Sequence, residues 1–101
     1  MRTAAKIDAN QHRIVSALAD VGASVQTLAA VGKGCPDLLV GYRNRNYLLE
    51  IKDPARDGKA YKERTLKALT KDQHKWQFFW QGQVDVVWDE AEALRTIGAT
   101  N

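Results

Sequence analysis

Hydrophobic residues at helical spacing open the chain and predict a first helix over residues 8–21. Asp8 suits the N-terminal cap of this helix, with Gln11 three positions later, and Gly22 suits its end. The apolar stripe that such a helix would bury consists of Ile14, Val15 and Leu18.

Four segments have the pattern of strands, because apolar residues alternate or cluster in them between turn-forming residues. The predicted strands are residues 23–28, 37–42, 47–52 and 83–88. The polar run 43–46 joins the second and third of them as a hairpin. Pro54 ends the third strand, because proline cannot donate a hydrogen bond to the ladder.

Two further helices are predicted from their capping residues. Thr70 with Gln73 marks the start of one, and Asp89 with Glu92 marks the start of the other. The resulting order is αβββαβα. Helices interleaved with strands predict an α/β fold with a mixed sheet flanked by helices, and 101 residues suit a single domain, 1–101.

The predicted hairpin brings three charged residues together. Glu50 and Lys52 project from one face of their strand, about 7 Å apart, because side chains alternate. A two-residue turn on Asn44-Arg45 would place Asp37 opposite Lys52 and diagonal to Glu50, within about 7–8 Å. The other face would receive the apolar set Leu38, Val40, Tyr42, Tyr47, Leu49 and Ile51.

A slip of one residue would send Asp37 to the face opposite Glu50. The register that suits the core is therefore also the one that gathers Asp37, Glu50 and Lys52. Carboxylate oxygens suit Mg²⁺ or Mn²⁺, which would activate a water, and an adjacent ammonium would stabilise the transition state of phosphodiester hydrolysis. The alternative is a salt-bridged hairpin whose charged groups only cover a solvated face.

The ordered motifs resemble those of a nuclease family. Gly34-x-Pro36-Asp37, then Glu50-Ile51-Lys52, then Leu69-Thr70-x-x-Gln73 together resemble the VRR-NUC (virus-type replication-repair nuclease) domain of the PD-(D/E)XK nuclease superfamily, whose small stand-alone members are frequent in phages. The resemblance covers residues 8–98 and implies a PD-(D/E)XK nuclease-like core. It also implies that Asp37, Glu50 and the backbone carbonyl of Ile51 hold the metal, and that Lys52 is catalytic.

The resemblance bears on two more residues, and each has a structural alternative. Family members usually add a glutamate on the first helix, for which Asp8 is the best match here; a simple N-cap is the alternative. Gln73 would sit beside the active site as a further catalytic residue. Its alternative is a capping box with Thr70, and both roles are compatible.

The chain is mildly basic, with a net charge of +3, which favours a polyanionic partner. Residues 53–69 are interpreted as a mobile basic flap that contacts nucleic acid; a solvated loop without that role is the alternative. Lys33, beside two glycines, is also expected to approach a phosphate. The basic residues predicted to bind nucleic acid are Lys33, Arg56, Lys59, Lys62, Arg64, Lys67 and Lys71.

Other reactive or aromatic residues are assigned structural roles. Trp76, Phe79 and Trp80 are interpreted as core or dimer packing rather than base-stacking groups. His12 and His74 are isolated and are not expected to bind metal. A single cysteine, Cys35, excludes an internal disulfide, and it lacks a His partner for nucleophilic catalysis.

The leading hypothesis is a Mg²⁺- or Mn²⁺-dependent DNA endonuclease selective for branched DNA such as a Holliday junction, working as a homodimer. The alternatives are a non-catalytic nucleic-acid-binding module and a nuclease active only with a partner protein. The sequence shows no signal peptide, membrane-spanning run or Walker loop, so no membrane association and no small-molecule cofactor are expected. The expected location is the cytoplasm, that of the host if the chain is phage-encoded.

Overall fold

The structure is a computed structural model that describes residues 9–53 and 69–99. Within these residues the elements follow the predicted order αβββαβα. The helices are α1 (Gln11–Asp20), α3 (Lys71–Phe79) and α4 (Glu90–Thr96). The strands are β1 (Ser24–Thr27), β2 (Leu38–Tyr42), β3 (Arg45–Ile51) and β4 (Asp85–Val87).

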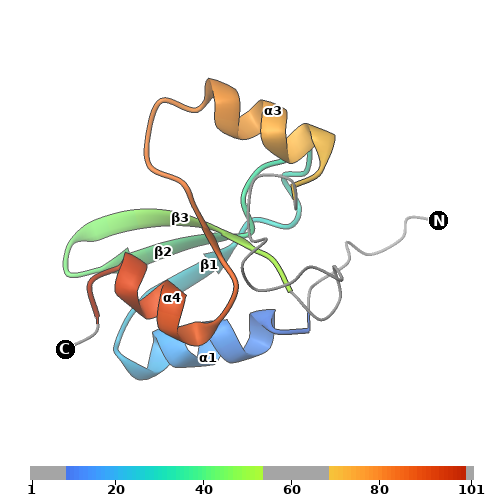
Figure 1. Cartoon of the computed structure of the whole chain (residues 1–101). Coiled ribbons are helices and arrows are strands. Elements are labelled where there is room, and N and C mark those ends of the chain that lie inside the picture. The colour runs from blue at the N-terminus through green and yellow to red at the C-terminus, as the bar shows by residue number, and fades with distance from the viewer. Residues whose placement is uncertain (1–8, 54–68, 100–101) are drawn as a thin grey trace.

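The strands form one mixed sheet in the order β1-β2-β3-β4. The pairs β1/β2 and β2/β3 are antiparallel, and β3 and β4 are parallel. Helices α1 and α4 lie together on one face of the sheet, and α3 lies on the opposite face (Figure 1). The predicted α/β fold with a mixed sheet flanked by helices is therefore confirmed.

The hydrophobic core lies between the sheet and the α1/α4 pair. Burying these side chains supplies the main driving force for folding. The predicted apolar face of the hairpin is confirmed, since its four aliphatic members are at most 1% exposed and Tyr42 and Tyr47 pack against them. The buried core comprises Ile14, Leu18, Leu38, Val40, Leu49, Ile51, Val87, Ala93 and Ile97.

The prediction that helix α1 begins at Asp8 is wrong. The helix begins at Gln11, with Asn10 in the N-cap position, and Asp8 itself lies outside the described residues. The Asn10 side chain does not cap the helix. It is 1% exposed, and its Nδ2 donates to the carbonyl oxygens of Lys52 and Trp88 at 3.0 Å each. A tertiary contact, rather than a local cap, therefore fixes where this helix begins.

The predicted hairpin register is also wrong, by two residues. Tyr42 pairs with Arg45, so the turn falls on Arg43-Asn44 rather than on Asn44-Arg45. Both turn residues have positive φ, at 51° and 67°, which is the geometry of a type I′ turn. The Arg43 guanidinium lies 5.1 Å from the centre of the Tyr42 ring and stabilises the turn further. A shift of two residues leaves every side chain on its predicted face.

Helix α3 carries its predicted cap but not its predicted burial. No residue of α3 is buried, Phe79 is 65% exposed and Trp80, just beyond the helix, is 44% exposed. The interpretation of Trp76, Phe79 and Trp80 as core packing is therefore wrong. Among the described residues, no helix is long and apolar enough to cross a membrane.

Candidate active site

The ends of β2 and β3 bring Asp37 and Glu50 to facing positions. Leu38 pairs with Leu49, so continuing the ladder by one residue sets Asp37 directly across from Glu50. The next pair would be Pro36 with Ile51, but proline has no N–H to donate. Instead, the Asp37 Oδ2 atom accepts a hydrogen bond from the Ile51 N–H at 2.7 Å. The carboxylate of Asp37 is thereby held at the point where the ladder stops.

Glu50 is a buried carboxylate, with 1% of its surface exposed. Its Oε2 accepts a hydrogen bond of 3.0 Å from the Gln73 Nε2 of helix α3. Burying a charged carboxylate costs several kcal/mol unless cations or hydrogen-bond donors compensate for the lost water. An amide donor from the facing helix supplies part of that compensation, so α3 contributes directly to the site.

The thiol of Cys35 lies close to both carboxylates. Burial raises the pKa of the Cys35 thiol, and the negative charges of Glu50 and Asp37 raise this pKa further. The thiol therefore stays protonated at neutral pH, which agrees with the expectation that Cys35 is not a nucleophile.

Lys52 continues the same face of the sheet. Its N–H donates to the Val87 carbonyl at 3.0 Å, so the ladder with β4 extends one residue beyond β3 and the alternation of side chains holds. Lys52 is 8% exposed. Its main-chain carbonyl accepts from Asn10, which ties the first helix to the backbone of the site.

The loop before β2 packs tightly on the start of α3. Gly34 has a φ of +84°, and a Cβ at this position would collide with the main-chain carbonyl group of Asp72. Only glycine allows this approach. The contact holds the first turn of α3, and with it Gln73, against the loop that carries Cys35 and Asp37.

Gln73 forms the predicted capping box and also contacts Glu50. Its Oε1 accepts from the Thr70 N–H at 2.9 Å, while the Thr70 Oγ1 accepts from the Gln73 N–H at 3.2 Å, which completes a capping box. The same side chain donates its Nε2 to Glu50. One amide therefore orders the start of α3 and fixes the orientation of the Glu50 carboxylate.

Glu50 and Lys52 are both buried. This burial excludes the alternative of a hairpin whose charged groups only cover a solvated face. Within residues 9–53 and 69–99, no group of three or more His, Cys, Asp and Glu side chains could hold a metal ion. Any divalent ion there would depend on two carboxylates, a backbone carbonyl and water. Mg²⁺ and Mn²⁺ suit such a set, since they bind hard oxygen donors and commonly retain waters. The donor chemistry of Asp37, Glu50 and the Ile51 carbonyl therefore fits these metals.

The remaining predicted site residues are only partly placed. Lys33 and Lys71 are both exposed, and they directly precede Gly34 and Asp72, the two residues whose backbones meet. His12 on α1 and His74 on α3 lie on opposite faces of the sheet (Figure 1). The described ends of the predicted flap, Asp53 and Leu69, are buried at 7% and 6% exposure. The other predicted residues lie outside the described part of the chain: Asp8, Arg56, Lys59, Lys62, Arg64 and Lys67.

Two residues that support the site were not predicted. Asn10 carries no local signal, because the residues that follow it up to Ile14 are also polar and the predicted helix would already have begun at Asp8. For Gly34 the sequence suggests a loop position where the backbone could approach a phosphate, whereas the structure shows it against the backbone of Asp72. A backbone contact with a helix residue 38 positions later has no local signal in the sequence.

Replacing Gln73 by glutamate separates its two roles. Gln73→Glu keeps an oxygen acceptor for the Thr70 N–H but replaces the donor to Glu50 by a second carboxylate. In EDTA, the free energy of unfolding should fall by about 1–3 kcal/mol, because a buried acceptor loses its donor. Addition of Mn²⁺ should restore part of this loss, since the new carboxylate adds a hard oxygen near the metal. Urea unfolding with and without Mn²⁺ measures both effects.

Thr70→Ala is the control for the cap alone. It should cost about 1 kcal/mol and should respond to Mn²⁺ as the wild type does. If the two variants lose equal amounts of unfolding free energy and neither responds to Mn²⁺, Gln73 acts only as a capping residue.

Comparison with known proteins gives no relative: no protein-family model, no curated protein and no solved structure matches this chain.

Proposed function

We propose that this chain is a Mg²⁺- or Mn²⁺-dependent DNA endonuclease with a core of the PD-(D/E)XK nuclease type. One observation carries the proposal: Asp37 and Glu50 occupy facing positions at the ends of two adjacent strands, with Lys52 two residues beyond Glu50 on the same face. Glu50 and Lys52 are buried and Asp37 is partly buried, and burying ionisable groups is costly unless they are paired or hydrogen-bonded. Ionisable residues gathered in this way on one face of a sheet are candidates for a functional site.

Each residue has a defined part in this proposal. Asp37, Glu50 and the Ile51 carbonyl would hold the divalent ion, which supplies a water of lowered pKa and neutralises charge on the scissile phosphate. Asp37 is kept in place by the Ile51 N–H, and Gln73 orients Glu50. The Lys52 ammonium would stabilise the negative charge that develops on the phosphate in the transition state.

The proposed substrate is branched or junction DNA, cut by a homodimer in the cytoplasm. A net charge of +3 supports a polyanionic substrate. A single small domain covers little DNA, so paired cuts across a junction need two active sites, which a twofold dimer provides. Recognition would depend on DNA shape more than on base identity.

A cleavage assay tests this function directly. Purified protein is incubated with end-labelled four-way junction, flap and linear duplex DNA, in Mg²⁺, in Mn²⁺ and in EDTA. We expect discrete products with either metal, more from junction or flap than from duplex, and no products in EDTA because the water is no longer activated.

Other outcomes separate the competing functions. Salt-sensitive binding that is independent of metal and gives no products would indicate a non-catalytic nucleic-acid-binding module. Cleavage that appears only after a helicase or another protein is added would indicate a nuclease dependent on a partner. Cleavage that persists in EDTA would exclude the proposed metal site.

A further inference from the structure

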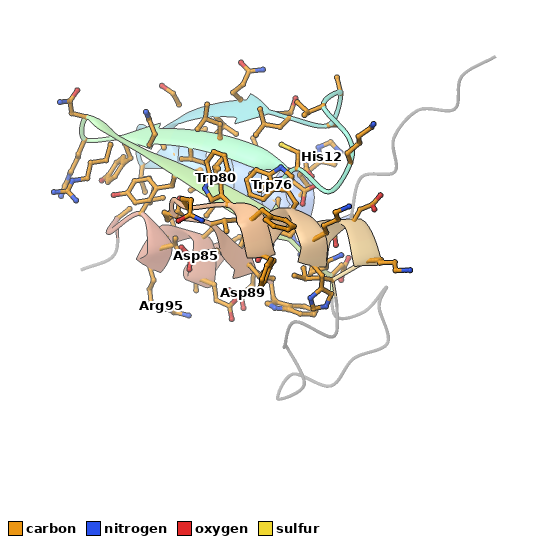
Figure 2. The ribbon with its side chains drawn as sticks, turned by 90° about the horizontal axis from the view of Figure 1, so that it is seen from above. His12, Trp76, Trp80, Asp85, Asp89 and Arg95 are labelled. Carbon is orange, nitrogen blue, oxygen red and sulfur yellow. The ribbon has the colours of Figure 1, made fainter. Side chains whose placement is uncertain are left out.

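The aromatic side chains around helix α3 face solvent. Phe78, Phe79 and Trp80 are 79%, 65% and 44% exposed. The rings of Trp76 and Trp80 stack with centroids 4.6 Å apart and planes at 22°, and Figure 2 shows them side by side. Exposed apolar surface of this extent is typical of a binding surface rather than of ordinary protein exterior.

A hollow of about 570 Å³ opens beside these rings, and we name it the α3 hollow. Its volume lies in the range of sites that bind small organic ligands. Two lysines against one aspartate give its wall a positive excess. The lining consists of Lys33, Asp72, Lys75, Trp76, Phe79 and Trp80.

The α3 hollow adjoins the candidate active site. Asp72 in its wall directly precedes Gln73, which donates to Glu50. Lys33 directly precedes Gly34, which lies against the Asp72 backbone. A second hollow of about 310 Å³ shares Trp80 and continues over the sheet, where Leu39 and Leu48 contribute to its lining.

We propose that the α3 hollow binds unpaired nucleotides of DNA, with bases stacked on its aromatic rings and phosphates beside Lys33 and Lys75. The proposal deepens the proposed function and rests on it, because it makes the substrate class DNA with a single-stranded segment next to the cleaved bond. Stacking on aromatic side chains suits any base, and lysines neutralise the backbone without reading sequence. Flaps, forks and opened junctions all provide such a segment.

A second copy of this chain fits the same surface less well. Lysine is depleted at protein–protein interfaces. A twofold contact through the α3 hollow would also bring Lys33 and Lys75 into one interface with the same lysines of the other copy. The same charges are favourable against a polyanion, so the mixture of rings and ammonium groups favours nucleic acid.

Two neighbouring phenylalanines provide a matched test. Phe79 lines the α3 hollow and a neighbouring hollow on α3, whereas Phe78, the more exposed of the two, lines only the neighbouring one. Affinity of the full chain for fluorescein-labelled oligo(dT) of 12 nucleotides is measured by anisotropy in EDTA. Phe79→Ala should weaken binding about 5- to 150-fold, the range expected for one lost base stack, and Phe78→Ala should change it less than about twofold.

Two further measurements use the tryptophans and the charge. Oligo(dT) should quench tryptophan fluorescence, because Trp76 and Trp80 flank the hollow while Trp88 is only 5% exposed. Lys33→Gln should weaken binding and reduce the slope of log affinity against log salt by about 0.7, as expected for one lost phosphate contact to a single strand. Thermal unfolding checks that each variant is folded.

Several results would overturn the proposal. Equal effects of Phe79→Ala and Phe78→Ala on affinity, or the absence of tryptophan quenching, would show that the α3 hollow does not bind nucleotides. Light scattering that shows a dimer dissociated by Phe79→Ala, with oligo(dT) affinity unchanged, would assign the hollow to a second copy of the chain.

The outcome of this binding test does not depend on whether the proposed nuclease function is correct. Binding in EDTA does not require cleavage, so the Phe79 result stands even if no nuclease activity is found. Conversely, metal-dependent cleavage with equal effects of the two phenylalanine variants would keep the nuclease and reject the nucleotide site.

Discussion

Replacing Glu50 by glutamine is expected to reduce metal-dependent cleavage by more than about 100-fold, since losing even a hydrogen-bonded neighbour of a metal ligand typically costs 10- to 100-fold. Glutamine keeps the size and shape of the side chain, and its amide oxygen can still accept from Gln73. The variant removes only the negative charge of a buried group that is 1% exposed. The rate of junction cleavage at saturating Mn²⁺ measures the loss.

The matched control is Asp20→Asn at the end of α1. It makes the same change in net charge on an exposed side chain of the opposite face. We expect wild-type cleavage from this control, and unchanged DNA binding in EDTA from both variants. A Glu50→Gln protein that cuts at the wild-type rate would refute the assignment of the active site.

Replacing Gly34 by alanine is the second large expected effect. A φ of +84° costs alanine about 1–2 kcal/mol, and its Cβ would also overlap the Asp72 carbonyl group. The loop and the start of α3 must then separate, which moves Gln73 away from Glu50. We therefore expect a loss of stability above 2 kcal/mol, on the scale of the φ cost plus the overlap, together with a strong fall in cleavage.

Gly32→Ala separates the two contributions within the same loop. Gly32 has a comparable φ of +72°, but an added Cβ would meet nothing within 4 Å. This control should show the backbone cost alone, with cleavage close to wild type. Urea unfolding and junction cleavage compare the two variants. Equal losses would mean that the contact between the loop and α3 does not support the site.

The pairing of the hairpin shows what the sequence can and cannot determine. Alternation of apolar and charged residues decides which face each side chain occupies, so the gathering of Asp37, Glu50 and Lys52 was predictable. A shift of two residues preserves that alternation, so the pattern could not distinguish Asp37 facing Lys52 from Asp37 facing Glu50. The position of the turn fixes the register, because Arg43 and Asn44 both adopt positive φ.

Local signals were reliable where the contact itself is local. The caps at Thr70 and Asp89 appear as predicted, because each involves residues three positions apart. The start of α1 was not predictable in this way, since Asn10 bonds to carbonyls 42 and 78 residues away. The exposure of α3 was missed for a related reason, because aromatic residues at helical spacing suggest burial whether or not a surface is available to cover them.

The Asn10 side chain has a consequence for the order in which the protein can be completed. Its amide nitrogen donates to the carbonyl oxygens of both Lys52 and Trp88. These two residues directly follow the parallel strands β3 and β4. During synthesis, this three-way junction cannot close until residue 88 has left the ribosome. The backbone of Lys52, a residue of the proposed site, is therefore secured by this amide only after strand β4 has been made.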